Sequence, residues 1–454
     1  QMCIRDRAGT IGTLKDKTVY PFVKHYLEEN GREVSRAEEN RLIQGCVGVR
    51  RTTGQHPGGL VVVPDDMDVE DFTAVQHPAD AEDADTITTH FEYHCMEDNL
   101  LKLDMLGHDD PTMIRMLEDL TGVNARQIPL DDPDTMSIFV SSKVLGFEND
   151  ELLGPTGAVA IPEFNTRFTR GMLMDTLPKD FNTLVRLSGF SHGTDVWLGN
   201  ARELIVSGTA SVLETVGCRD DIMLYLISMG LDPKMSFKIM EAVRKGKVKK
   251  GGFQEGWVEA MQEHNVPQWY IDSLAKIGYL FPKAHAVAYV MMAFRIAWFK
   301  VHRPLAFYAT FFTVRAKAFD AEYCCAGIDA VKQKIREIEN NKDATAVEKN
   351  LMVTLEVCYE FYLRGFHFDT ISIYDSDATA FKITENGLLP PFISVRGLGE
   401  SAALDTVEKR KGKRFISVEE FSTCCNKLSK THIEQLKALG SFAGMADTSQ
   451  ITLF

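Results

Sequence analysis

The segment AHAVAYVMMAFRIAWF, residues 284–299, constrains the fold more than any other part of this chain. Its only charged residue is Arg295, and the run is shorter than the roughly 18 apolar residues that a membrane span requires. A helix that is apolar on all sides has to be covered by other elements. The segment therefore predicts a buried core helix inside a larger domain and gives no reason to expect a membrane partner.

Length and composition set the broad class. A chain of 454 residues has room for roughly two to four domains. A net charge of −14 argues against attraction of the whole surface to nucleic acid or anionic lipid. Local basic patches stay compatible with that charge, because screening limits charge effects to about 8–10 Å. The nine cysteines show no zinc-site spacing, and their odd number fits reduced thiols in a cytosol.

The first quarter of the chain alternates between apolar and polar residues, as strands do. GGLVVVP (58–64) predicts a short buried strand, and TITTHFEYH (86–94) predicts a strand with Ile87, Thr89, Phe91 and Tyr93 on one face. Before them, GVRRTTGQHPGG (48–59) predicts a glycine-rich turn. On that turn, Arg50 and Arg51 suit phosphate oxygens, and the alternative is a solvated turn.

LLKLDML (100–106) predicts a further strand, with Leu101, Leu103 and Met105 facing the core and Lys102 and Asp104 on the other face. Asp104 could hold Mg²⁺ together with other carboxylates and substrate phosphates. The alternative is an acid at a strand end that pairs with Lys102 or with solvent. Asp110-Pro111, which follows, predicts a helix start.

Two histidine groups suggest a different kind of metal site. The side chains of His90, Glu92 and His94 would share one face of the predicted strand 86–94, where a solvated face is the alternative. His108-Asp109 resembles the central pair of an HD phosphohydrolase, but it lies in a strand-to-helix turn.

From about residue 125 to 320 the pattern is helical, with helix starts at Asp132-Pro133 and Asp232-Pro233. FPKAHAVAYV (281–290) places Lys283 and His285 at a helix start, where they suit phosphate, and Tyr289 one turn later, where it suits base stacking. A capped helix with a core tyrosine is the alternative. Arg219 in GCRDD could likewise reach phosphate or pair with the adjacent acids.

Two further motifs lie near the end of the chain. VRGLGESAAL (395–404) has the Gly-x-Gly of a helix-hairpin-helix, where Gly397 and Gly399 would let the backbone approach a DNA phosphate; an ordinary turn between helices is the alternative. The last residues, QITLF, expose apolar anchors of the kind that dock into a partner's groove, or else pack on their own domain.

Taken together, these motifs resemble the Gram-positive-type (PolC) alpha subunits of replicative DNA polymerase III, which are C-family polymerases. The resemblance runs from about residue 7 to the C-terminus. It rests on RAGTIGT, RRTTGQHPGGLVVVP, LLKLDMLGHDDPTMIRML, IPEFNTRF, SGFSHGTDVWLGN, GCRDDIM, HNVPQWYI and FPKAHAVAYV. QMCIRDR (1–7) instead looks like translated adaptor sequence, and we expect the natural chain to continue upstream.

The resemblance implies an α+β multidomain fold with a partial nucleotidyltransferase-type palm sheet, mainly helical fingers and a helix-hairpin-helix-containing C-terminal domain. It assigns the palm with a small thumb to 8–125, the fingers to 126–325, a duplex-DNA-binding domain to 326–446 and a clamp-binding tail to 447–454.

It also implies a DNA-directed DNA polymerase that adds dNTPs to primer 3′ ends with two Mg²⁺ ions. Asp104 would be one of three catalytic, metal-binding aspartates, and the other two would lie upstream of this chain, which we therefore expect to be inactive alone. The implied nucleotide site is Arg219, Lys283, His285 and Tyr289; the DNA contacts are Arg50, Arg51, Gly397 and Gly399; and the clamp anchors are Gln450, Leu453 and Phe454.

The implied partners are primer-template DNA, dNTPs, the sliding clamp (beta subunit) and other replisome subunits in the bacterial cytoplasm. Two alternatives remain at this point. One is a non-catalytic DNA- and clamp-binding module, and the other is a metal-dependent phosphohydrolase that uses the histidine groups.

Overall fold

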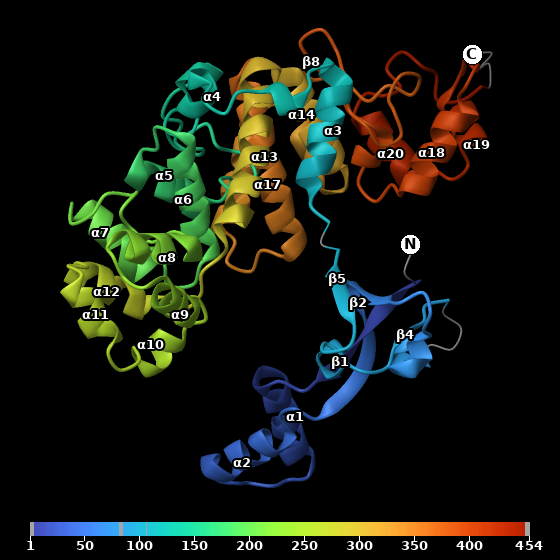
Figure 1. The fold of residues 1–454 in the computed structure, drawn as a ribbon. Helices are drawn as coiled ribbons and strands as arrows, with labels where there is room; N and C mark the ends of the chain where they lie inside the picture. The colour runs from blue at the N-terminus through green and yellow to red at the C-terminus, as the bar shows by residue number, and fades with distance from the viewer. Residues whose placement is uncertain (1–3, 81–84, 106, 450–454) are drawn as a thin grey trace. The chain divides into compact units, whose positions relative to one another are not determined.

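A computed structural model describes residues 4–80, 85–105 and 107–449 of the chain (Figure 1). These residues form two compact units, the first ending at His108 and the second beginning at Asp109. The fold is α+β: the first unit carries a small antiparallel sheet, and the second is mainly helical.

The N-terminal unit is built on a three-stranded sheet in the order β1-β2-β5, with antiparallel pairing on both sides of β2. Helices α1 and α2 lie between β1 and β2 in the sequence, and β3 pairs with β4 in a separate two-stranded ladder. The elements are β1 (Ile4–Thr13), α1 (Asp16–Glu29), α2 (Arg36–Cys46), β2 (Arg50–Val63), β3 (Val75–Gln76), β4 (Thr88–Thr89) and β5 (Leu101–Asp104).

The predicted turn at 48–59 is wrong, because most of it belongs to β2. This strand begins at Arg50 and continues without a break to Val63. It pairs with β1, where Thr53 lies opposite Ile11, and the register shifts leave extra residues on β2 between Gln55 and Leu60 and at Arg51. Pairing on both sides of the glycines thus keeps the segment extended despite the local turn preference of Gly54, Gly58 and Gly59.

The predicted strand over 86–94 is also wrong, except at Thr88–Thr89, which form β4. Thr89 Oγ1 accepts a hydrogen bond of 2.9 Å from the Gly9 amide, and Thr73 Oγ1 accepts one of 3.0 Å from the Phe91 amide. The chain turns away after Thr89, and a 3₁₀ turn follows at Tyr93–Cys95. Ile87 and Phe91 are exposed as a result, so the predicted apolar face does not exist.

Strand β5 forms where it was predicted, but its faces are reversed. Leu101, Leu103 and Met105, predicted to face the core, are 62%, 36% and 63% exposed. The register explains the reversal: Lys102 lies opposite the fully buried Val61, and residues directly opposite each other share a face. The stem of Lys102 therefore covers the core side of the sheet.

The C-terminal unit is organised around α13 (Lys283–His302), the helix predicted from its apolar composition. Within the described residues it is the one helix long and apolar enough to cross a membrane, and its packing explains that composition. Figure 1 shows α13 beside α17, with α4 to α12 on one side and α18 to α20 on the other. One continuous hydrophobic core extends from Met113 to Phe442.

The aspartate-proline signals form the predicted caps. Asp132 accepts a hydrogen bond of 2.8 Å from the Thr135 amide, and Asp232 accepts one of 2.9 Å from the Met235 amide. The first helix of the unit begins at Asp109, one residue before the predicted cap at Asp110.

The α-helices of the C-terminal unit, besides α13, are α3 (Asp109–Thr121), α4 (Pro133–Ser137), α5 (Arg167–Thr176), α6 (Phe181–His192), α7 (Arg202–Val206), α8 (Arg219–Ser228), α9 (Pro233–Arg244), α10 (Lys247–Gly251), α11 (Trp257–Glu263), α12 (Gln268–Lys276), α14 (Pro304–Val314), α15 (Ala321–Cys324), α16 (Ile328–Asn340), α17 (Ala346–Leu363), α18 (Glu400–Lys409), α19 (Val418–Cys424) and α20 (Lys430–Ala438). Its short strands are β6 (His367–Phe368), β7 (Lys382–Ile383) and β8 (Gly387–Leu389).

Candidate functional site

The first turns of α8 and α13 meet in the C-terminal unit. The Arg219 amide donates a hydrogen bond of 3.0 Å to the Phe281 carbonyl, and Asp220 accepts one of 2.7 Å from the Lys283 amide. Two helix N-termini, each with a cationic side chain at its first residue, therefore lie side by side. The helix dipole makes such ends favourable for anions, and here the carboxylates of Asp220 and Asp221 already accept hydrogen bonds from amides at the junction.

Asp221 holds the two sides of this junction together. Its carboxylate accepts hydrogen bonds from the Cys218 amide at 2.8 Å and from Arg186 Nη1 at 3.0 Å, and it lies 3.6 Å from Lys283 Nζ. A cavity of about 220 Å³ opens beside these groups. Burial raises the pKa of the Cys218 thiol to about 12, so the thiol stays protonated and uncharged near neutral pH.

Four rings from α6, α13 and the segment before α13 form a connected column. The ring of His285 lies 4.3 Å from Tyr289, 4.9 Å from Phe281 and 5.7 Å from His192, measured between centroids. His192 also packs edge-on against Phe281 at 5.3 Å. The neighbouring rings are tilted or edge-on to one another, with interplanar angles from 42° to 72°, and they lie around the first two turns of α13.

Of the four residues predicted for a nucleotide site, Lys283 lines the cavity beside Asp221, and His285 and Tyr289 lie in the ring column. Arg219 Nε lies 3.9 Å from Asp220, which is the pairing with an adjacent acid that the sequence left open as an alternative. The sequence prediction missed His192, Arg186 and Asp221, which complete the arrangement. His192 lies in the motif SGFSHGTDVWLGN, which indicates the family resemblance but no role for this histidine. Its position 93 residues before His285 offers no local signal for contact.

Asp104, the predicted metal ligand, is the last residue of β5 and is about half exposed. Its carboxylate lies 3.2 Å from Lys102 Nζ, which is the pairing that the sequence left open as an alternative. Among the described residues, no group of three or more His, Cys, Asp and Glu side chains lies close enough to hold a metal. The described acids therefore do not make the two-ion site that the resemblance implies.

The histidine groups do not form a metal site in the described part of the chain either. His90 Nδ1 lies 2.6 Å from the side-chain oxygen of Gln76, and Glu92 precedes the 3₁₀ turn instead of lying in a strand. Asp109 begins α3. This removes the geometric basis for the phosphohydrolase alternative.

Arg50 and Arg51 lie at the start of β2, and both are exposed. The guanidinium of Arg51 lies 5.2 Å over the ring of Phe22 in α1, a cation–π contact. The contact leaves the arginine at the surface of the N-terminal unit.

The glycine hairpin has the predicted conformation. Gly397 has φ +78°, which favours glycine, and Gly399 is the N-cap of α18. Arg396 beside it is held by Asp320 and Glu322 at 2.8 and 3.0 Å, so its charge is already paired.

The sequence prediction missed a second helical hairpin, formed by α19 and α20. The turn between them carries Lys427, and Ser429 caps α20 by accepting a hydrogen bond from the His432 amide. The signal for it was the serine three residues before His432 at a helix start. Gln450, Leu453 and Phe454, the predicted clamp anchors, lie outside the described residues.

Three stretches of the chain match known protein families. Residues 9–107 match the bacterial DNA polymerase III alpha NTPase domain, and residues 110–265 match the bacterial DNA polymerase III alpha subunit finger domain. Residues 365–450 match the helix-hairpin-helix motif.

Curated relatives match almost the whole chain. The DNA polymerase III PolC-type of Caldanaerobacter subterraneus subsp. tengcongensis is 56% identical over 449 residues, which are 99% of this chain and 32% of the relative. The DNA polymerases III PolC-type of Bacillus subtilis and Streptococcus mutans are 51% and 50% identical, again over 99% of this chain and 31% of each relative. The chain thus spans about a third of the length of these relatives, and it belongs to the PolC-type DNA polymerase III family.

Proposed function

We propose that this chain serves a replicative DNA polymerase by binding the incoming deoxynucleoside triphosphate. The reaction joins the primer 3′-oxygen to the α-phosphorus and releases pyrophosphate as the α–β phosphoanhydride bond breaks. The observation that supports the proposal best is the meeting of Arg219 and Lys283 at two helix N-termini, with the rings of His285 and Tyr289 in the first turns of α13.

Each of these groups has a chemical role in the proposal. Arg219 and Lys283 neutralise the triphosphate, aided by the positive ends of the α8 and α13 dipoles. Tyr289, at the end of the ring column, stacks on the base, because a base offers an aromatic ring a π-face whatever its identity. The carboxylate of Asp221 holds Lys283 in the empty site and is displaced from it when phosphate binds.

The remaining assignments belong to the same proposal. The partial palm with its thumb (8–125) supplies Asp104 as one Mg²⁺ ligand, and Arg50 and Arg51 contact DNA. The domain 326–446 holds the duplex through Gly397 and Gly399, and the tail 447–454 binds the sliding clamp. Among the described residues, Asp104 belongs to no group of three or more potential metal ligands, so the Mg²⁺ site would need further ligands.

Titration calorimetry with dATP tests the nucleotide site. We expect Arg219→Ala and Lys283→Ala each to weaken dATP binding by roughly tenfold or more, since a hydrogen bond to a charged group contributes about 1.5–3 kcal/mol. Arg336→Ala and Lys411→Ala are matched controls at exposed positions elsewhere in the unit. Equal loss in the controls, or no loss at Arg219 and Lys283, would refute the site.

A second function has one observation in its favour: no metal-binding cluster exists among the described residues. The chain would then be a module that binds DNA, nucleotide and clamp without catalysis. Primer extension by the 454-residue chain separates the two functions. Incorporation of dNTPs above background would exclude the module.

A further inference from the structure

An irregular segment, residues 151–166, runs through the core of the C-terminal unit without forming a helix or strand. A buried segment of this kind needs partners for its backbone carbonyls. Lys300, fully buried in α13, donates hydrogen bonds to the carbonyls of Gly157 at 2.8 Å and Val159 at 2.6 Å. Its charge is balanced by Glu360 of α17 at 2.7 Å, which also accepts a hydrogen bond from Tyr308.

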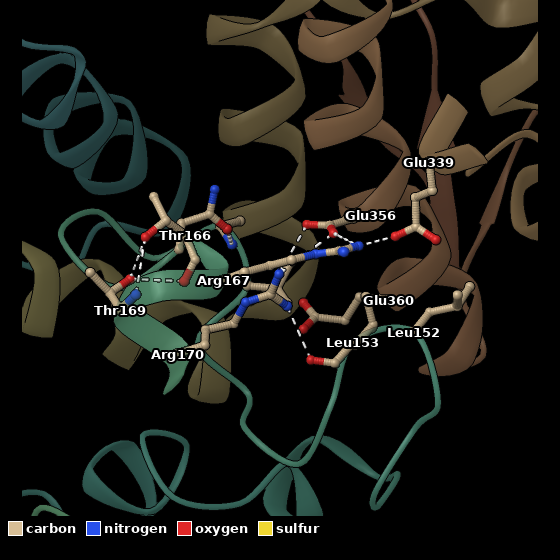
Figure 2. Close-up of polar contacts among 12 residues, drawn as sticks. Leu152, Leu153, Thr166, Arg167, Thr169, Arg170, Glu339, Glu356 and Glu360 are labelled. Carbon is tan, nitrogen blue, oxygen red and sulfur yellow. Dashed lines mark hydrogen bonds and ion pairs between the residues drawn. The ribbon is translucent and has the colours of Figure 1, made fainter. Parts of the chain in front are cut away.

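A second cation holds the beginning of the same segment. Figure 2 shows Arg170 reaching the carbonyl of Leu153, at 3.0 Å, and the carboxylate of Glu356. Arg167 extends this network to Glu339 on α16. Buried charges on three helices thus fix the path of the segment, and this makes it a rigid support for whatever side chains it carries.

The segment carries two strained residues. Ala160 has φ +61° and Glu163 has φ +69°, a region that costs a residue other than glycine roughly 1–3 kcal/mol. The side chain of Asn165 accepts a hydrogen bond of 2.6 Å from the Ala160 amide, which helps to hold the turn. Strain of this kind persists where the surroundings over-determine the backbone, often beside a functional site.

The strained backbone places the Glu163 carboxylate against α6. It accepts a hydrogen bond of 2.9 Å from the Ser188 hydroxyl and lies 3.5 Å from His192 Nε2. At the other side of the imidazole, Nδ1 donates to the Ser188 carbonyl at 2.8 Å. Both ring nitrogens of His192 therefore face fixed oxygens, so the ring has one orientation, and in that orientation it packs on Phe281 and His285.

We propose that Glu163 is a positioning residue of the nucleotide site: its carboxylate fixes His192, and the ring of His192 holds His285 and, through it, the stacking surface of Tyr289. This inference rests on the proposed function. It assigns Glu163 and His192 to the base-binding side of the site, whereas Arg219 and Lys283 serve the phosphates.

The test compares two probes, dATP and inorganic tripolyphosphate, on the whole chain. In Glu163→Gly the carboxylate is lost and the backbone strain is relieved together, so the variant should be at least as stable as the wild type. We expect its Kd for dATP to rise roughly three- to tenfold through weaker stacking, while its Kd for tripolyphosphate stays unchanged. Glu163→Gln keeps an acceptor for Ser188 and should recover part of the dATP affinity.

Asn149→Gly is the matched control, because Asn149 has φ +48° and is exposed in the same unit. Asn149→Gly also relieves backbone strain, but it should leave the Kd for dATP and the Kd for tripolyphosphate unchanged. His192→Ala should reproduce the loss seen in Glu163→Gly, and the double variant should lose no more than either single variant, as expected for residues that act in series.

Normal dATP binding by Glu163→Gly would overturn the inference. So would equal weakening of both probes together with a lower melting temperature, because this would mark Glu163 as purely structural. A wild-type chain that binds neither probe would instead overturn the proposed function, and this inference with it.

Discussion

The two units of this chain bury their side chains in different ways. Among its described residues, the N-terminal unit has two separate small cores, one around Val61 and Leu100 and the other between α1 and α2. The C-terminal unit has a single continuous core, and inside it lie buried ions that hold an irregular segment in place. A large core can enclose charges and strained backbone, which a small one cannot compensate.

The difference also appears at the surfaces. The N-terminal sheet exposes Leu101, Leu103 and Met105 in a row on one face of its edge strand, whereas its other face is packed. We infer that the C-terminal unit is the more stable of the two. All four tryptophans lie in this unit, so their fluorescence reports its unfolding separately from that of the N-terminal unit.

The largest expected effect is at the buried ions. Glu360→Ala removes the carboxylate that balances the buried charge of Lys300 and accepts from the Tyr308 hydroxyl, which should cost about 3–5 kcal/mol of unfolding free energy. Urea unfolding followed by tryptophan fluorescence measures this cost, and hydrogen exchange in the N-terminal unit should not change. The double variant Lys300→Met with Glu360→Leu should regain most of the loss. A single-variant cost below about 1 kcal/mol would contradict the role of the network.

A smaller effect is expected in the N-terminal core. Leu100→Ala should cost that unit about 2 kcal/mol, at the low end for leucine because its small core can relax around the cavity. Hydrogen exchange of residues 96–104 should accelerate while tryptophan fluorescence stays unchanged. Leu274→Ala, at an equally buried leucine of α12, is the matched variant and should shift the fluorescence transition instead. If Leu100→Ala also shifts the tryptophan fluorescence transition, the two units do not unfold separately.

The smallest effect concerns a partly exposed ion pair in the C-terminal unit. The hydrogen bond from Arg244 lowers the pKa of Glu241 from 4.5 to about 2. As the pH falls, the Glu241 carboxylate takes up a proton at a higher pH in the unfolded chain than in the folded one. The stabilisation is therefore complete above pH 4.5 and is lost as the pH falls toward 2. Glu241→Gln should therefore cost about 0.5–1 kcal/mol at pH 7.

Urea midpoints of the wild type and Glu241→Gln, compared at pH 7 and near pH 3, measure this loss. The difference in urea midpoint between the wild type and Glu241→Gln should be smaller near pH 3 than at pH 7. A midpoint difference that is the same at both pH values would show that the ion pair does not contribute to the unfolding free energy.

Local signals predicted several features correctly. The apolar run at 284–299 is the core helix α13, Asp132 and Asp232 cap their helices, and Gly397 turns the hairpin with a positive φ. Each depends on the residue itself and its near neighbours in sequence. The group of Arg219, Lys283, His285 and Tyr289 was predicted from the family resemblance, and spacing alone left a capped core helix as an equal interpretation.

The features that were missed or wrong depend on long-range contacts. Whether Lys102 or Leu103 faces the core follows from the register with β2, since a shift of one residue exchanges the two faces of a strand. The contact between Glu163 and His192 joins α6 to a segment whose path is set by Lys300 and Arg170. No periodicity in the sequence around Glu163 indicates either partner.

The sequence by itself determined the elements: where helices start, which helix is apolar on every side, and which cations and rings are available. The tertiary structure decided which of them meet. It joined the ends of α8 and α13, turned the Lys102 face of β5 inward, and directed Glu163 at His192 through a strained turn. The physical reason is that caps and apolar composition act over one or two turns, whereas register and buried ion pairs act between residues far apart in the chain.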